Sequence, residues 1–127
     1  MSLKSPLGRV LGLGAANGSH HWWMQRLTSI ALVPLTLWFA IALLTLPDLG
    51  WVTVHEWLAE PLSTVLLILL IPALLHHSWL GLAVVVEDYV PGKTAKTLTL
   101  LVLQLLHVFI AAAALFAILK IAFGYTP

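Results

Sequence analysis

The sequence predicts an all-α membrane protein with three transmembrane helices, and two observations support this fold class. Hydrophobic residues make up 61% of the 127 residues and charged residues only 9%, whereas soluble domains carry about 25% charged residues. The few charges are clustered, so three uncharged segments remain. Each is long enough to cross a bilayer core of about 30 Å, which takes about 20 residues. We therefore expect one membrane domain.

Composition also excludes several kinds of site. The chain contains no cysteine, which rules out disulfides, thiolate metal sites and iron–sulfur clusters held by this chain. Its net charge of +1 gives no reason to expect a nucleic-acid partner. Residues 1–19 contain Lys4 and Arg9 but no acid, and we interpret them as a cytoplasmic tail. Residues 20–127 then form the transmembrane domain.

The first transmembrane helix is predicted over about residues 22–47, because no charge occurs between Leu27 and Pro47. Pro34 lies inside this segment and is expected to bend the helix, which membrane helices tolerate. The stretch from Asp48 to Glu60 contains three acids and no Lys or Arg. It is predicted to be a polar connection.

The second and third helices are predicted over about residues 58–89 and 95–123, around uncharged segments at 61–86 and 97–119. Pro61 suits a first helical turn, and Pro72 is expected to kink the second helix. Pro91 and Gly92 end that helix. The loop before the third helix is therefore short.

Lysine and arginine indicate the orientation, because they are enriched in cytoplasmic loops. They precede the first helix or follow the second, whereas the connection at 48–60 has none. This pattern places the N-terminus in the cytoplasm and the C-terminus outside. Lys120, at the end of the third helix, is the one charge that disagrees.

His77 is the strongest candidate for a functional residue within the membrane. It precedes Asp88 by eleven residues, which places it about 16 Å along the helix, near the bilayer midplane. The same helix face carries Gly81, where a flat ring could approach the backbone. A neutral imidazole at this depth needs partners: heme iron is one that a membrane cytochrome supplies, and the backbone or hydroxyl groups of another helix are the alternative. His76 points about a third of a turn away and is the alternative ligand.

His107 lies about 15 Å into the third helix, at nearly the depth of His77. A heme held by His77 and His107 of this one chain is therefore one alternative. A histidine at such a position can also bond neighbouring protein groups. We favour the interpretation of His107 as a hydrogen-bonded packing residue.

At the cytoplasmic rim, Asp88 and Tyr89 follow the second apolar segment. A phenol can donate a hydrogen bond to a quinone carbonyl and a carboxylate can orient it, although rim tyrosines and acids are common in membrane proteins. Arg26, with His20 and His21 before it, could contact heme propionates. Arg26 could equally be an ordinary positive-inside anchor.

These residues together resemble a known family. The pattern His77-Ser-Trp-Leu-Gly81 followed by Asp88-Tyr89-Val90 is similar to the cytochrome b membrane anchor of succinate dehydrogenase (complex II), specifically its small hydrophobic anchor subunit. The segment from His20 to Arg26 also resembles the start of that family's first helix. The distinctive part is the spacing in the second helix.

The resemblance implies a non-catalytic anchor in the inner membrane of a bacterium or mitochondrion, within the electron-transport and tricarboxylic acid pathways. His77 would bind heme b on one side, and a companion cytochrome b anchor subunit would supply the other axial ligand. Tyr89 and Asp88 would contact ubiquinone, and Arg26 would lie near the propionates. An iron–sulfur subunit and a flavoprotein subunit would dock on the cytoplasmic side.

Two other functions compete with this interpretation. One is a self-contained bis-histidine cytochrome that uses His77 and His107. The other is a non-redox membrane assembly subunit or small transporter, whose histidines relay protons or bind a metal.

Overall fold

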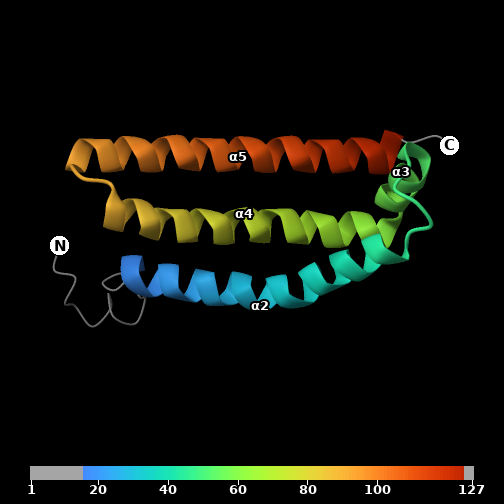
Figure 1. Ribbon diagram of the computed structural model, residues 1–127, viewed down its shortest axis with the longest axis horizontal. Coiled ribbons are helices and arrows are strands. Elements are labelled where there is room, and N and C mark those ends of the chain that lie inside the picture. Colours follow the sequence, from blue (N-terminus) through green and yellow to red (C-terminus); the bar gives the residue numbers. More distant parts are fainter. Residues whose placement is uncertain (1–15, 125–127) are drawn as a thin grey trace.

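The computed structural model describes residues 16–124, with side chains from residue 22 onward. This part of the chain is all helical and contains α2 (Ala16–Thr45), α3 (Trp51–Ala59), α4 (Pro61–Tyr89) and α5 (Lys93–Gly124) (Figure 1). Three of these helices are long and apolar enough to cross a membrane, over Trp22–Thr45, Pro61–Tyr89 and Lys93–Gly124. The predicted all-α fold with three transmembrane helices is confirmed.

The polar connection predicted between Asp48 and Glu60 is not irregular throughout, because it contains the short helix α3. Asp48 organises the start of this helix: its Oδ1 accepts a hydrogen bond from the Gly50 N–H at 2.7 Å. Glu60 ends α3 in an extended conformation and is also the N-cap of α4, which begins at Pro61. The charge pattern at 48–60 located the boundary between two membrane spans but not the helix within it.

The bounds of the long helices differ from the predicted ones by a few residues. The first helix begins at Ala16, inside the predicted tail, and ends at Thr45. The second begins at Pro61 instead of residue 58. Both differences arise because charge marks the apolar span, whereas helical backbone begins and ends independently of it in the polar interface. Figure 1 shows α2 bending in its middle part, the region of the helix that contains Pro34.

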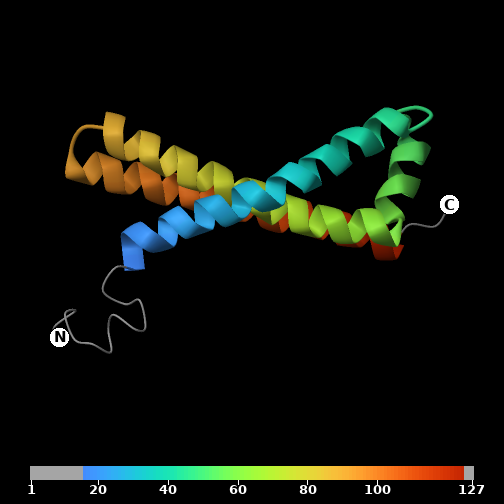
Figure 2. The same cartoon turned by 90° about the horizontal axis from the view of Figure 1, so that it is seen from below.

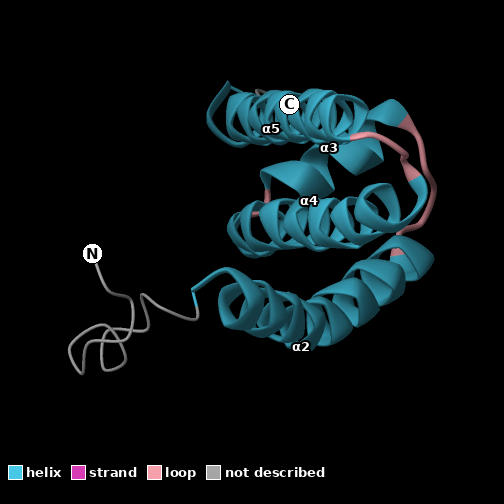
Figure 3. Ribbon diagram, turned by 90° about the vertical axis from the view of Figure 1, so that its left-hand side faces the viewer, coloured by secondary structure: helices cyan, strands magenta, loops and turns pink. Residues whose placement is uncertain are grey.

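The long helices form a single layer. Seen from the end, α5, α4 and α2 lie one after another with α4 in the middle (Figure 3). Helix α4 packs against both neighbours, and in the described part of the chain α2 and α5 do not pack against each other. Helices α4 and α5 run side by side, whereas α2 crosses them at a clear angle (Figure 2). Both broad faces of α4 are therefore left partly uncovered.

The buried core is small and lies toward the end of the bundle that carries α3. Its main cluster is Trp57, Leu67, Leu70 and Ile118, and Trp57 stacks on Trp38 of α2 with ring centroids 5.9 Å apart. Leu80, Ala83 and Val86 are buried farther along α4. Only 6% to 17% of each membrane span is buried within the chain. The rest of the apolar surface must be covered by lipid or by other subunits.

Candidate functional site

The His77 side chain of α4 faces the neighbouring helix α2. Its Nδ1 lies 3.3 Å from the hydroxyl oxygen of Thr28, and Thr28 is buried, with 7% of its surface exposed. Residues 28 and 77 are far apart in sequence but are brought together where α2 crosses α4. The predicted candidate ligand thus has a fixed protein partner at one ring nitrogen.

The hydrogen bonds of Thr28 determine which way the bond to His77 runs. The Thr28 hydroxyl lies 2.8 Å from the Met24 carbonyl and 3.1 Å from the Gln25 carbonyl. Carbonyl oxygens only accept, so the hydroxyl proton is used in donating to the α2 backbone. The oxygen is then left to accept from His77 Nδ1–H. This assigns the tautomer of His77 with its proton on Nδ1 and a lone pair on Nε2.

His77 Nε2 makes no hydrogen bond to any described residue. Gly81, one turn along α4, has no atom within 4 Å of the position that a Cβ would occupy. The surface next to Gly81 is therefore open, so a flat ring has room to approach the helix backbone there. Together these residues offer one imidazole lone pair and an unobstructed stretch of helix.

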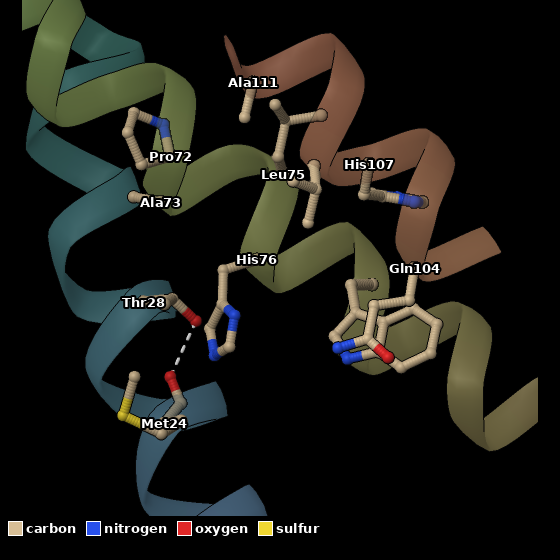
Figure 4. Close-up of a pocket in the computed structure, with 11 residues that line it drawn as sticks. Met24, Thr28, Pro72, Ala73, Leu75, His76, Gln104, His107 and Ala111 are labelled. Carbon is tan, nitrogen blue, oxygen red and sulfur yellow. Dashed lines mark hydrogen bonds between the residues drawn. The ribbon is translucent and has the colours of Figure 1, made fainter. Parts of the chain in front are cut away.

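His76 faces a different environment from His77. It lines a pocket of about 500 Å³ formed by α2, α4 and α5, and its Nε2 atom is buried. Figure 4 shows His76 beside Thr28 of α2, while Gln104 and His107 reach the pocket from α5. The two adjacent histidines therefore have different surroundings: His77 forms a hydrogen bond with α2, and His76 lines the pocket between the three helices.

His107 is a hydrogen-bonded packing residue, as favoured from the sequence. Its Nδ1 lies 2.8 Å from the Leu103 carbonyl of the same helix, so Nδ1–H donates there. Its Nε2 lies 3.2 Å from the Ser78 hydroxyl of α4, so it accepts the Ser78 proton. Both ring nitrogens are used, and the pair links α5 to α4.

Gln104 was not among the site residues predicted from the sequence. It is exposed, lines the same pocket, and makes no hydrogen bond to a described residue. An unpaired carboxamide at membrane depth is costly in lipid. The available signal was that Gln104 is the one amide side chain in the uncharged segment 97–119. Gln104 therefore presents a polar group to the pocket that it lines.

The predicted rim residues lie at the surface, at the end of the bundle where α4 ends and α5 begins (Figure 1). Tyr89 is 80% exposed, and Asp88 is also exposed. The Arg26 guanidinium carbon lies 5.4 Å from the centre of the Trp22 ring, a cation–π contact. The side chains of His20 and His21 lie outside the described residues.

Among the described residues, no three His, Cys, Asp or Glu side chains are grouped closely enough to hold a bare metal ion. A single imidazole from this chain suits instead a metal that brings most of its own ligands, as heme iron does. The residues around His77 fit such a group: one lone pair, a neighbouring glycine and a fixed ring orientation. A metal-binding, non-redox function gains no support from this geometry.

Comparison with known proteins agrees with the geometry. Residues 1–119 match the family described as succinate dehydrogenase/fumarate reductase transmembrane subunit. The succinate dehydrogenase hydrophobic membrane anchor subunit of Rickettsia felis is 33% identical over 98 residues, which cover 76% of this chain and 81% of that protein.

Two further relatives bear the same name. The protein from Rickettsia conorii is 33% identical over 92 residues, covering 72% of this chain and 73% of the relative. The one from Rickettsia bellii is 30% identical over 105 residues, covering 82% and 83%. These matches extend over most of each chain. The chain therefore belongs to the family of succinate dehydrogenase and fumarate reductase transmembrane subunits.

Proposed function

We propose that this membrane anchor holds one side of a b-type heme through His77 and contributes Tyr89 and Asp88 to a ubiquinone site. As a member of its family the chain is a hydrophobic membrane anchor of succinate dehydrogenase, and it is not an enzyme by itself. The finer assignment concerns which groups this chain supplies to the assembled complex. A bound heme would supply a one-electron carrier within the membrane.

The observation that carries the assignment of His77 is its hydrogen bond to Thr28. Histidines that bind metals usually donate their other ring N–H to a protein acceptor, which fixes the tautomer and the ring orientation. The contact between His77 Nδ1 and Thr28 Oγ1, at 3.3 Å, leaves Nε2 as the free ligand atom. Thr28 is itself held by two backbone carbonyls of α2, so the acceptor is rigid.

The hydrogen bonds of His107 disfavour a heme held by this chain alone. His107 uses both ring nitrogens in hydrogen bonds to Leu103 and Ser78. Binding iron would require breaking the Ser78 bond and leaving its hydroxyl without that acceptor. The second axial ligand is therefore assigned to the companion cytochrome b anchor subunit.

Exposure of the rim residues supports a shared quinone site. Tyr89 is 80% exposed, and Asp88 is exposed beside it. At a membrane interface their phenol and carboxylate are available to a quinone headgroup and to neighbouring subunits. Arg26 is exposed at the same end, where its charge can pair with a heme propionate. His20 and His21 are proposed to assist there.

The proposed arrangement also gives an orientation. Arg26, Lys93 and Lys96 lie at the end of the bundle where α2 begins and where α4 meets α5. By the positive-inside rule this end faces the cytoplasm. The iron–sulfur and flavoprotein subunits would dock there, next to Tyr89. The opposite end, with α3 and the last turn of α5, would lie outside.

The adjacent histidines provide a matched test of the ligand. The complex is purified with His77→Ala or with His76→Ala, and reduced-minus-oxidised absorbance spectra are recorded per assembled complex. We expect His77→Ala to abolish or strongly alter the b-heme bands. His76→Ala is expected to leave them in place. The reverse result would assign the ligand to His76, and unchanged spectra in both variants would reject ligation by this helix.

A further inference from the structure

We infer that the end of the bundle opposite the proposed quinone rim contains a binding site for the headgroup of an anionic phospholipid, with Lys120 as its cation. The site is a pocket of about 540 Å³ between α3 and α5. It is lined by Trp51, His55, Phe116, Ala117, Lys120, Ile121 and Gly124. None of these residues takes part in the proposed heme or quinone contacts.

The depth of Lys120 matches a lipid headgroup. It is the first charge after the uncharged segment 97–119, whose length is about 34 Å as a helix. Its ammonium group therefore lies at the boundary between hydrocarbon and headgroups. No acidic side chain of the described residues forms an ion pair with Lys120 within 4.0 Å. The cation is available for an external anion.

The walls of the pocket combine an apolar surface with polar groups, as a phospholipid does. Phe116 lies one helical turn before Lys120 and is 68% exposed, so it offers an apolar surface to an acyl chain. Across the pocket, Trp51 is 75% exposed and forms a ring contact with His55 at 3.6 Å between centroids. An exposed indole next to a lysine is typical of the membrane interface.

The start of α3 does not compete for the anion. The Asp48 carboxylate already accepts the Gly50 N–H at 2.7 Å, so that helix end has its own negative charge. Lys120 is the one lysine or arginine among the residues that line this pocket. A phosphodiester with two acyl chains can pair with the Lys120 ammonium group and also pack its chains against the apolar wall. A free phosphate can pair with the ammonium group but cannot cover the apolar wall.

The test measures phospholipid retained by the purified whole complex. Wild type, Lys120→Gln and Lys93→Gln are exchanged into detergent, and bound phosphatidylglycerol and phosphatidylcholine are quantified by mass spectrometry. Lys93 is on the same helix at the other end, so its variant is the charge-matched control. One lysine near a membrane surface corresponds to about a fivefold change in anionic lipid binding. Because detergent removes the bulk membrane surface, only a lysine that lines a lipid-holding pocket should retain lipid. We therefore expect this loss of phosphatidylglycerol for Lys120→Gln, none for Lys93→Gln, and recovery in Lys120→Arg.

Several results would overturn the inference. Equal retention by Lys120→Gln and wild type would do so, as would equal loss from Lys93→Gln. Displacement of the bound lipid by inorganic phosphate would show a simple anion site. Loss of another subunit at constant lipid content would show that Lys120 pairs with a protein carboxylate. If Lys120→Gln does not assemble, Ala117→Phe fills the same pocket while keeping the lysine, and it must also lower phosphatidylglycerol retention.

Discussion

Thr28→Val is the substitution that most directly probes how His77 is held. Valine keeps the shape of the buried threonine but has no hydroxyl, so the acceptor for His77 Nδ1–H disappears. The two backbone bonds of Thr28, at 2.8 and 3.1 Å, also disappear, but helix α2 satisfies those carbonyls by itself. The change therefore acts mainly on the orientation and tautomer of the imidazole.

The size of the effect follows from the bond that is lost. A distance of 3.3 Å is at the long end for such hydrogen bonds, whose net worth is about 1 kcal/mol. Loss of such a supporting partner typically weakens metal binding by about 10- to 100-fold. Because the bond is long, we expect the lower end: heme is lost from the complex about tenfold more readily.

The assay follows the b-heme absorbance per complex during incubation with apomyoglobin as heme acceptor. Thr28→Ser keeps the hydroxyl and is expected to behave as wild type. Ser29→Ala is the matched control, since the one hydrogen bond of the Ser29 hydroxyl to a described residue goes to the Gln25 carbonyl, at 2.7 Å, and not to His77. Heme loss from Thr28→Val at the wild-type rate would refute the assigned tautomer.

Other predictions concern the rim, α5 and α3. Tyr89→Phe lowers quinone reduction by about a hundredfold, while succinate oxidation with an artificial acceptor persists; loss of both activities would indicate misassembly instead. His107→Phe leaves the b-heme spectrum unchanged but lowers the stability of the α4–α5 contact by about 1 kcal/mol. Thermal unfolding in detergent measures the stability, and loss of the heme spectrum would show that His107 is needed for heme binding. Hydrogen bonds from the Gly50 N–H and the Thr53 side chain lower the pKa of Asp48 below its ordinary value. This contribution to stability is present above the unfolded-state pKa and is lost as the pH falls through the folded-state pKa, so titration by NMR should give a lowered pKa that rises in Thr53→Val.

The spans were predictable because their signal is a property of composition. Long uncharged segments must be helical in lipid, where every backbone group needs an internal partner. The short helix α3 was not predicted, because the charges at 48–60 indicate contact with water but not the backbone conformation. Both helices and loops occur in contact with water. Its surface is amphipathic, with Trp57 buried and Glu56 exposed. The buried side of α3 can be identified only from the positions of α4 and α5, against which it packs.

The site was only partly predictable. Helical spacing placed His77 and Gly81 one turn apart on the same helix, and the pairing of His107 with protein groups was the favoured interpretation. The contact between Thr28 and His77 was not foreseen as a pair, because it depends on where α2 crosses α4. The pocket with His76 and Gln104 likewise needs three helices. Such contacts depend on helix packing. The spans are apolar on all sides, so their sequence gives little indication of which face packs against which helix.

The proposed heme site requires that His77 supplies an axial ligand through Nε2. This ligation can be observed in a density map of the whole complex, at a resolution that separates the imidazole from its surroundings. We predict heme iron bonded to His77 Nε2, with Nδ1 still next to the Thr28 hydroxyl. A map in which the His77 ring contacts only protein groups, with the iron bonded to His76 or to residues of other subunits alone, would rule out His77 as the ligand.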